Sequence, residues 1–532
     1  MAAPTYKPLL YTTTVRNPER YKDFMHILYR YEGKILNNEL IESIEKEFFK
    51  IGLYRPMKYP ISVKEKFDTG AKGALIEIAL TDAEAKQVYD MNDPLKDPLI
   101  KGHKEKGFDK GWPSRFDTQF KFMKTLGFVN YSIGKPIVFS ETGKLFASIV
   151  DIQIIKGFVH REVINPHYET IAFQHAFAKQ QRCNPFIQEL NDNIPLILLL
   201  KTIRLLNADP QFNNCGIAYH EIPLIIFWKD NDAEALYRRI KLLRTKYRYN
   251  VSDEVIIDIC KNEILGGFKE FDNKSIMRDY PDEFIRKMRV TGLISFRGAG
   301  RFVDVNHKED KKIDYIIDKY SVYEKYETED EYYNYMSSVD PYLLKVESNV
   351  EDKSDSARLL NNWVEIYNWE TIKKELFILS KRKSSDDNVL KFIAAPARLE
   401  FLTALAIKSK FRNIVVIPNY PCDDTGLPTS TAGGNNGDIE CIEEPNGILV
   451  EVTMAEGRQQ TMMEVWPIAR HLADFQKKYK RESNCIFVAP SIFEDSENQI
   501  EWLKSKDTPL YIRPYEIENF VGYIENATAL YN

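Results

Sequence analysis

Two carboxylates, Asp438 and Glu451, are spaced so that they could bind one divalent cation. They belong to the segment DIECIEEPNGILVEVT, in which two runs of strand-forming residues flank the turn-forming sequence EPNG. In a hairpin whose loop has an even number of residues, positions 438 and 451 fall on one face, because side chains alternate along a strand. Two carboxylates on adjacent strands suit Mg²⁺, which keeps waters and open positions for a phosphate. An exposed hairpin with ordinary surface acids would show the same spacing.

Three further side chains have the chemistry to assist such a site. Glu464 and His471 are seven residues apart in QQTMMEVWPIARHLADF, so at 100° per residue they lie about 20° apart on one helix, which Pro467 would bend. A carboxylate and an imidazole facing the hairpin could move protons or orient a water. Glu400 lies among apolar residues in RLEFLTALAI. For each of these, an ordinary role in helix packing or on an exposed helix face remains open.

The elements that must position these residues form an alternating pattern. Residues 388–410 read as a helix, 413–417 as a strand, 438–453 as the hairpin, the segment around His471 as a helix and 485–489 as a strand. This order predicts a mixed α/β core over residues 386–532 with the acids gathered at one edge. A polar, helix-poor segment at 381–387 places the boundary of this domain near residue 385.

Residues 1–302 combine helical patterns with short apolar hairpins, and 303–385 is acidic, rich in tyrosine and helical in pattern. A helix at 114–126, two strands within 128–140 and a helix from 141 follow the order of a winged helix, and 285–306 repeats part of it. Segments 194–206 and 218–228 resemble a helix-turn-helix pair. We therefore predict a mostly α, winged-helix-like recognition region over 1–302 and a helical linker over 303–385.

Basic residues cluster in the first region. Residues 101–124 hold seven basic side chains against three acidic ones, and LYRRIKLLRTKYR at 236–248 holds six and no acid. Basic runs interleaved with aromatic residues suit contacts with the phosphates of duplex DNA, although a solvated helix face has the same composition. The candidate DNA-binding residues are Lys110, Arg115, Lys121, Lys124, Arg238, Arg239, Lys241, Arg297 and Arg301.

Composition excludes several classes of protein. The 532 residues carry a formal net charge of −5, which excludes a generally polybasic chain. No apolar stretch approaches the about 20 residues that span a bilayer, and the polar N-terminal segment has no secretory core, so no membrane partner is expected. The six cysteines are at least 19 residues apart, which excludes a C-x-x-C zinc motif and indicates reduced thiols in a cytoplasm.

Four motifs in the C-terminal part resemble the AlwI-like type IIS restriction endonucleases and the nicking endonucleases related to them. An AGN-x-P-D strand corresponds to 434–438, a G-E-V-T-T strand to Glu451, Val452 and Thr453, and an E-x-x-P-x-x-R-H helix to the segment from Glu464 to His471. The E-[FW]-L-T helix corresponds to 400–403. Weaker similarity extends to TTTVRNPERY near the N-terminus, MKTLGFV, ETGKLFA and RVTGLISFRG.

The resemblance implies a modular enzyme of a prokaryotic cytoplasm. Its N-terminal subdomains would recognise a short asymmetric sequence in double-stranded DNA, and a C-terminal PD-(D/E)XK nuclease domain of the restriction-endonuclease type would cut at a fixed distance outside it, with Mg²⁺. Asp438 and Glu451 would be the metal ligands, and Glu400, Glu464 and His471 would complete the catalytic site. A cognate DNA methyltransferase is expected in the same system.

One position departs from the wider superfamily pattern, because Thr453 stands where a lysine is expected two residues after the second acid. The resemblance implies that such a threonine is normal in this family, and it leaves His471, Glu464 or a second metal to polarise the water. One such site cuts one strand, so cleavage of both strands would need a transient homodimer or a small second nuclease subunit. The alternatives are a strand-specific nicking endonuclease, the large subunit of a heterodimeric restriction enzyme, and a non-catalytic DNA-binding regulator.

Overall fold

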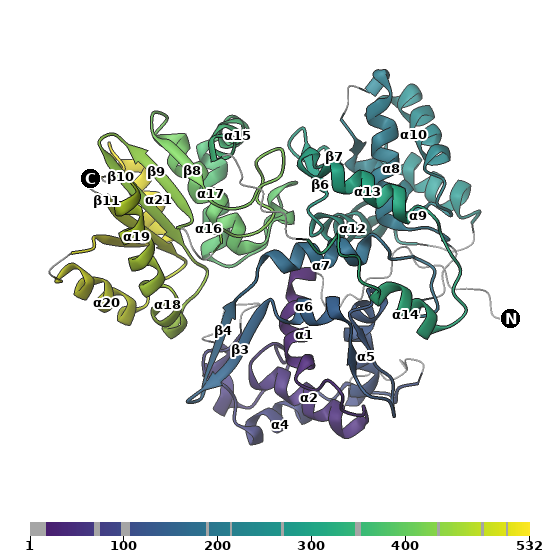
Figure 1. The fold of residues 1–532 in the computed structure, drawn as a ribbon, viewed down its shortest axis with the longest axis horizontal. Coiled ribbons are helices and arrows are strands. Elements are labelled where there is room, and N and C mark those ends of the chain that lie inside the picture. The colour runs from purple at the N-terminus through teal and green to yellow at the C-terminus, as the bar shows by residue number, and fades with distance from the viewer. Residues whose placement is uncertain are drawn as a thin grey trace. The chain divides into compact units, whose positions relative to one another are not determined.

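A computed structural model of the 532-residue chain describes the residues 17–68, 75–96, 107–187, 191–212, 215–267, 271–345, 353–433, 437–479, 483–506 and 509–531. Three lysines of the first basic segment, Lys101, Lys104 and Lys106, lie outside these residues. So do positions 12–16 of the N-terminal segment and 434–436 of the motif GGNNGD. The chain divides into two compact units, residues 1–346 and 347–532 (Figure 1).

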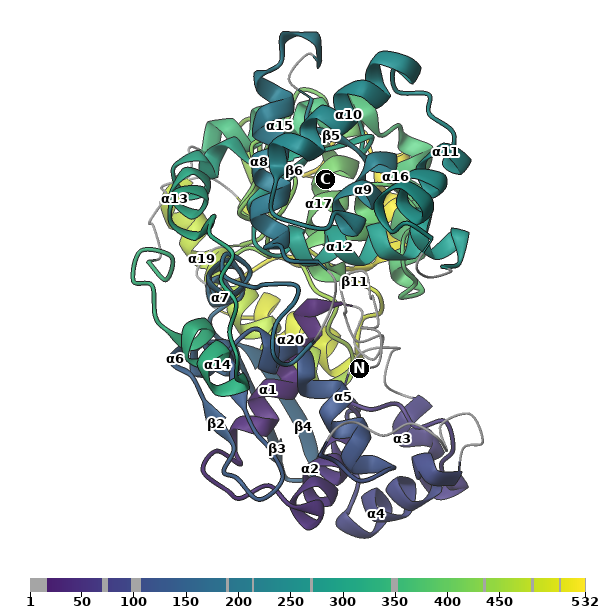
Figure 2. The ribbon, with the colours of Figure 1, turned by 90° about the vertical axis from the view of Figure 1, so that its right-hand side faces the viewer.

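The first unit is mostly helical. Its helices are α1 (Tyr21–Tyr29), α2 (Asn38–Lys50), α3 (Lys64–Asp68), α4 (Asp82–Met91), α5 (Trp112–Thr125), α6 (Glu141–Ala147), α7 (His167–Phe177), α8 (Pro195–Ala208), α9 (Ile222–Phe227), α10 (Ala233–Tyr247), α11 (Asp253–Asp258), α12 (Tyr280–Arg289), α13 (Asp310–Tyr320) and α14 (Glu329–Ser337). Helices α2 and α4 pack side by side (Figure 2). Phe24, Phe48 and Phe120 form an aromatic core between α1, α2 and α5, with ring centroids 5.2 and 6.0 Å apart.

Short antiparallel strands connect these helices. They are β1 (Val129–Asn130), β2 (Val138–Phe139), β3 (Val150–Ile155), β4 (Phe158–Val163), β5 (Ile217–Ala218), β6 (Ile294–Arg297) and β7 (Phe302–Val305). The pair β1–β2 lies between α5 and α6, and the hairpin β6–β7 follows α12, so the elements predicted for both wings occur in the predicted order. Strand β5 extends the second hairpin to three strands in the order β5-β7-β6.

The helix predicted over 218–228 is shorter than expected. Ala218 pairs with Phe302 as part of β5, and the helix α9 begins only at Ile222. Pro223 in its first turn explains this start, since proline is tolerated where a helix has no internal N–H bond to lose.

The region predicted as a linker, 303–385, is divided between the two units. Helices α13 and α14 belong to the first unit, where Tyr332 is buried and its hydroxyl accepts a hydrogen bond from the Gln181 N–H (3.0 Å). The acidic residues of this segment begin α14, because Thr328 and Glu331 form a capping box. Tyr332 is therefore a packing residue of the first unit.

The second unit is a five-stranded mixed sheet between helices. Its strands are β8 (Val415–Pro418), β9 (Ile439–Glu443), β10 (Asn446–Val452), β11 (Ser483–Ala489) and β12 (Ile512–Glu516), in the order β12-β11-β10-β9-β8. Strands β8, β9 and β10 are antiparallel, and β10, β11 and β12 are parallel. The helices are α15 (Lys353–Ile366), α16 (Trp369–Ser380), α17 (Ala395–Lys410), α18 (Gly457–Met463), α19 (Val465–Tyr479), α20 (Glu494–Lys504) and α21 (Ile517–Asn526).

Both faces of this sheet are covered. Leu449, Cys485 and Phe487 pack on one face with the apolar sides of α19 and α20. Side chains alternate along each strand, so Val450 and Ile486 point to the opposite face, which α17 and α21 cover. The helix predicted over 388–410 begins at Ala395, because Pro396 sets its first turn. Among the described helices none is both long and apolar enough to cross a bilayer.

Candidate active site

Asp438 and Glu451 lie opposite each other at one end of the β9–β10 hairpin. The strands pair Glu443 with Asn446 around a two-residue loop, and the register continues to Ile439 opposite Val450. One step further along the register, position 438 is opposite 451, so both carboxylates share a face as their spacing predicted. The Val452 N–H donates a hydrogen bond to Asp438 Oδ2 (2.8 Å), which fixes this carboxylate against the neighbouring strand.

Gly437, directly before Asp438, is needed for this close approach. A Cβ atom at position 437 would lie 2.8 Å from Glu451 Oε1 and 2.4 Å from Leu449 Cδ1. Any other residue would therefore push against the Glu451 carboxylate or displace the strand. Our sequence reasoning did not single out this glycine, although its place directly before the first acid was a usable signal.

His471 and Glu464 approach the same face from the helical side. His471 Nδ1 lies 2.9 Å from Glu451 Oε1, and the Thr453 hydroxyl donates to Glu464 Oε1 (2.8 Å). The prediction of one continuous helix bent at Pro467 is wrong, because α18 ends at Met463 and α19 begins at Val465. The break falls at Glu464 because Pro467 lies in the first turn of α19, where its missing N–H costs no helical bond.

Glu400 reaches the site from the other layer of the unit. It lies on α17, is 3% exposed, and accepts a hydrogen bond from the Ala432 N–H (3.0 Å) through Oε2. Burial, followed by the charge of Asp438, raises the pKa of this carboxyl well above its ordinary value. The structure therefore brings all five residues predicted for the catalytic site, Glu400, Asp438, Glu451, Glu464 and His471, into one electrostatic neighbourhood.

The carboxylates of this site disfavour their own ionisation. Asp438 is partly exposed, but the protein around its carboxyl displaces most of the water. This desolvation, and then the charge of Glu451, raise the pKa of Asp438. Burial and then the charge of Glu464 raise the pKa of Glu451, and burial raises that of Glu464 itself. A bound cation would stabilise the ionised forms of these acids, because it would offset both their mutual repulsion and their poor solvation.

The donor set fits a hard divalent ion that takes few protein ligands. In the described part of the chain no group of three or more His, Cys, Asp or Glu side chains has the geometry of a complete metal cage. Mg²⁺ does not need one, because one or two carboxylates together with waters and a substrate phosphate complete its shell. Asp438 and Glu451, which face each other across two strands, are the two residues here that could supply those carboxylates.

The raised pKa values predict how the stability of the metal-free protein depends on pH. A carboxyl whose pKa is raised by folding stabilises the native state below its unfolded pKa, about 3.8 for Asp and 4.5 for Glu, and this contribution is lost as the pH rises through the raised value. We therefore expect the melting temperature in EDTA to fall as the pH rises above this range. Because protons and the cation compete for the same oxygens, Mg²⁺ should raise the melting temperature more at pH 8 than at pH 6.

Differential scanning fluorimetry at the two pH values, with EDTA and with Mg²⁺, measures both effects. Asp438→Asn is the matched comparison, since it removes one proposed ligand and one charge. An Mg²⁺ effect of equal size at both pH values, or one retained in Asp438→Asn, would contradict the assignment.

A second set of hydrogen bonds holds the strand that begins directly after Asp438. The Asn419 N–H donates to the Asp438 carbonyl oxygen (2.8 Å), and its Nδ2 donates to the Gly437 carbonyl oxygen (2.6 Å). Glu440, two residues after Asp438, accepts hydrogen bonds from Lys478 Nζ (2.9 Å) and the Tyr479 hydroxyl. These contacts join β8 and the end of α19 to β9, and sequence reasoning had no signal for them because their partners are distant in the chain.

The predicted DNA-binding residues fall into two groups. Lys110, Arg115, Arg238 and Arg301 are exposed on the first unit, and Arg238 also pairs with the exposed Glu234 on the same helix (3.5 Å). Others form ion pairs with acids of the same unit: Lys121 with Asp117 (3.1 Å), Arg239 with Glu263 (2.5 Å), Lys241 with Asp209 (2.7 Å) and Arg297 with Asp304 (3.3 Å).

Lys124 does not lie at the surface as a phosphate contact requires. Its side chain is buried, and its ammonium donates to the Tyr131 carbonyl oxygen (2.9 Å) and lies 3.4 Å from Glu329. The ammonium also lies over the rings of Tyr131 and Phe186. A buried cation is retained only where such partners replace its water, so Lys124 has a packing role in this structure.

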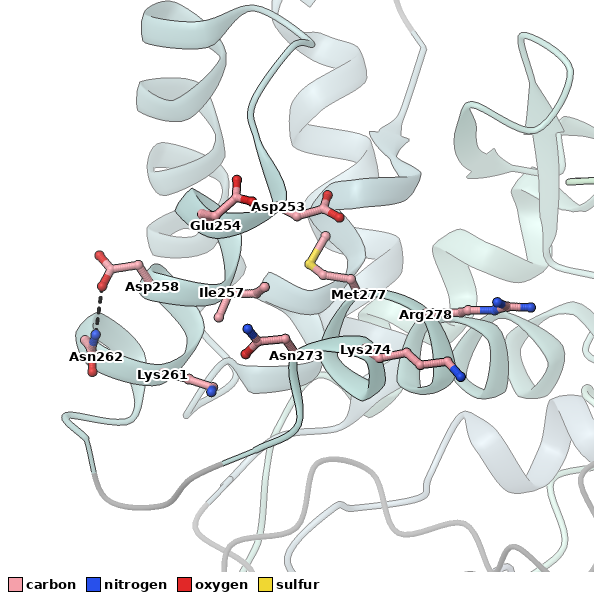
Figure 3. Close-up of a pocket in the computed structure, with 10 residues that line it drawn as sticks. All are labelled: Asp253, Glu254, Ile257, Asp258, Lys261, Asn262, Asn273, Lys274, Met277 and Arg278. Carbon is pink, nitrogen blue, oxygen red and sulfur yellow. Dashed lines mark hydrogen bonds between the residues drawn. The ribbon is translucent and has the colours of Figure 1, made fainter.

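A cavity of about 580 Å³ lies in the first unit (Figure 3). It is bounded by α11 and two π-helical turns, Ile259–Ile264 and Ser275–Asp279. Its lining combines acidic Asp253, Glu254 and Asp258 with basic Lys261, Lys274 and Arg278. Because both signs of charge are present in equal number, the cavity favours neither an anion nor a cation, and it contains none of the residues predicted for the site.

Comparison with known proteins places the chain in a family. The model of the family described as AlwI restriction endonuclease matches residues 150–369 and 347–523, which together span more than half of the chain. Among solved structures, the small subunit of the heterodimeric restriction endonuclease R.BspD6I is 22% identical over 30% of this chain and 78% of that chain, with a TM-score of 0.25. No curated protein matches the chain.

Proposed function

Because the chain belongs to the AlwI restriction endonuclease family and is therefore a site-specific deoxyribonuclease, we propose that it is a Mg²⁺-dependent enzyme of type IIS. In this proposal it recognises a short asymmetric sequence in double-stranded DNA and hydrolyses phosphodiester bonds a few base pairs outside it. The observation that carries the proposal is the cluster of mutually repelling carboxylates at the end of the β9–β10 hairpin. A protein that only binds DNA has no use for acids that repel each other in this arrangement.

Asp438 and Glu451 would hold the Mg²⁺ ion, consistent with a PD-(D/E)XK nuclease domain built on the mixed sheet. When bound, this ion supplies Lewis-acid stabilisation of the negative charge that develops on the scissile phosphate. Glu400 adds a third negative charge behind Asp438 and thereby strengthens the attraction for the cation. The products of in-line attack by water would be 5′-phosphate and 3′-hydroxyl ends.

His471 is suited to accept a proton from the attacking water. An ionised Glu451 can only accept a hydrogen bond, so a neutral His471 ring carries its hydrogen on Nδ1, which lies 2.9 Å from Glu451 Oε1. Nε2 then presents a lone pair, as in other histidines whose tautomer is set by a carboxylate. Glu464 offers a second acceptor for the same proton. In this account the two residues share the work for which other nucleases use a lysine.

The first unit would recognise the DNA, with its helix–hairpin regions acting as winged-helix-like modules. The exposed side chains of Lys110, Arg115, Arg238 and Arg301 are suited to contact phosphates. Four less exposed cations, Lys121, Arg239, Lys241 and Arg297, would contact phosphates only by exchanging their present acidic partners.

Removing one exposed cation tests this division of roles. Arg238→Ala should lower the slope of log K against log salt by about one, because each phosphate contact releases about one counterion. Fluorescence anisotropy with a labelled duplex over a range of salt concentrations measures the slope. Lys86→Ala is the matched control, since Lys86 is an exposed cation paired with Asp90 on α4. Equal slopes for wild type and Arg238→Ala would remove Arg238 from the interface.

Cleavage of both strands would require a second active site, from a transient homodimer or a small second nuclease subunit. The second unit carries an exposed aromatic pair, Trp466 and Trp502, which are 45% and 50% exposed with ring centroids 5.7 Å apart. Exposed aromatic residues are enriched in protein interfaces, which favours an association through α19 and α20. A cognate DNA methyltransferase is the other partner we propose, because a restriction enzyme endangers unprotected host DNA.

Incubation of the purified chain with supercoiled plasmid, with Mg²⁺ and with EDTA, tests the proposal. Run-off sequencing of both strands then maps every cut. Mg²⁺-dependent linear products cut beside one short motif support the type IIS enzyme, and a yield that rises with the square of enzyme concentration supports the homodimer. Circles broken in one strand only would instead indicate a nicking endonuclease or the large subunit of a heterodimer. Plasmid left intact under every condition would indicate a DNA-binding regulator and contradict the proposal.

A further inference from the structure

Thr453 occupies a rigid position at the end of the strand that carries Glu451. Its N–H donates to the Val488 carbonyl oxygen (3.0 Å), so the parallel pairing of β10 with β11 continues through residue 453. It lies two positions after Glu451, with only Val452 between them, so both side chains point to the same face of the sheet. The Thr453 hydroxyl is thereby fixed beside the proposed metal ligands.

The Thr453 hydroxyl makes two hydrogen bonds. Its Oγ1 accepts one from the Ala455 N–H (3.0 Å). It donates the other to Glu464 Oε1 (2.8 Å). A hydrogen bond donated to a carboxylate favours the ionised form of that carboxylate.

The backbone around both partners is also fixed. Gln460, which is buried, donates to the carbonyl oxygens of Ala455 (3.1 Å) and Ser491 (2.9 Å). Its Oε1 accepts from the Phe493 N–H (2.9 Å), and the Gln460 carbonyl oxygen accepts from the Glu464 N–H (3.0 Å). The loop after β10 and the break between α18 and α19 are therefore connected by hydrogen bonds, which fix the backbone that carries Glu464.

We propose that Thr453 is a positioning residue that holds the Glu464 carboxylate in one orientation beside Glu451 and His471. This inference rests on the proposed nuclease function and deepens it. A lysine at this position would act on the water directly. Thr453 instead donates its hydroxyl hydrogen to Glu464 and acts through that carboxylate. Thr453 therefore contributes to catalysis, although it replaces the lysine of the wider superfamily.

Thr453→Val tests the proposal because valine keeps the shape and removes only the hydroxyl. We expect kcat at saturating Mg²⁺ to fall about 10- to 100-fold, the usual size for a lost hydrogen bond to a charged group, with KM for DNA unchanged. Thr453→Ser, which restores the hydroxyl, should recover most of this loss. The Mg²⁺-induced rise in melting temperature should persist in both variants, because Asp438 and Glu451 are untouched.

A double-mutant cycle with Glu464→Gln separates positioning from a general structural effect. If Thr453 acts through Glu464, the double variant should cleave no more slowly than Glu464→Gln alone. Wild-type kcat in Thr453→Val, failure of serine to recover activity, or effects that multiply in the double variant would each overturn the proposal. Asp438→Asn, measured in parallel, separates failure of the Thr453 proposal from failure of the proposed function. If Asp438→Asn still cleaves DNA, the proposed active site itself is wrong.

Discussion

Asp438→Asn should lower the rate of plasmid cleavage by about 10³-fold, the scale on which removal of one key electrostatic group in an active site acts. The asparagine side chain can still accept the Val452 N–H bond through its carbonyl oxygen, so the hairpin should keep its geometry. What is lost is one negative charge and one of the two proposed ligands. Glu451→Gln should have an effect of similar size for the same reason.

The same substitution should not destabilise the protein. Because the surroundings of Asp438 raise its pKa, its charge opposes folding in the absence of a cation, and a neutral side chain relieves that cost at pH 8. We therefore expect Asp438→Asn in EDTA to melt at the wild-type temperature or above it while it binds duplex DNA normally. Asp474→Asn is the control, since Asp474 is an exposed acid on α19. Cleavage by Asp438→Asn at the wild-type rate would show that the catalytic carboxylates lie elsewhere.

Arg244→Ala should destabilise the first unit by about 3–5 kcal/mol, the cost of breaking one partner out of a buried ion pair. Arg244 lies on α10 with its side chain 1% exposed, and Glu221 opposite it is 0% exposed. The guanidinium donates two hydrogen bonds to Glu221 (2.9 and 2.7 Å) and one to the Gly216 carbonyl oxygen (2.8 Å). Alanine would leave the Glu221 carboxylate buried without its cation.

Two further variants identify the cause of this loss. Arg244→Met combined with Glu221→Leu should recover most of the stability, because apolar side chains of similar volume need no charged partner. Arg238→Ala, an exposed arginine on the same helix, should change the free energy of unfolding by less than about 0.5 kcal/mol. Urea unfolding of the four proteins measures these differences. A stable Arg244→Ala, or an equally unstable Arg238→Ala, would show that the buried pair is not what holds α10.

The site could be predicted from the sequence where a short-range rule decides the geometry. Asp438 and Glu451 were predicted to share one face of the hairpin if its loop has an even number of residues. The loop in the structure has two residues and meets that condition. Such a relation depends on residues close together in the chain, so it can be predicted from the sequence. The approach of His471 to the hairpin followed from the family resemblance, because the continuous helix that periodicity predicted is interrupted at Glu464.

Other features depend on packing that a linear pattern does not contain. The basic run at 236–248 contains both exposed Arg238 and buried Arg244, which differ only in the side of α10 they occupy. The signal existed, because Arg244 is four residues from buried Ile240 and so on its face. No such signal marked Lys124, whose partner Glu329 is distant in sequence.

Binding of Mn²⁺, an ion with the same preference for carboxylate oxygens as Mg²⁺, tests whether Asp438 and Glu451 are metal ligands. Electron paramagnetic resonance of the free ion, during titration of the chain without DNA, counts the bound ions and gives their affinity. We expect saturable binding of Mn²⁺ by wild type and Asp474→Asn, and binding that is lost or at least tenfold weaker in Asp438→Asn and Glu451→Gln. Equal Mn²⁺ binding by all four proteins would contradict the assignment of these two carboxylates as the metal ligands.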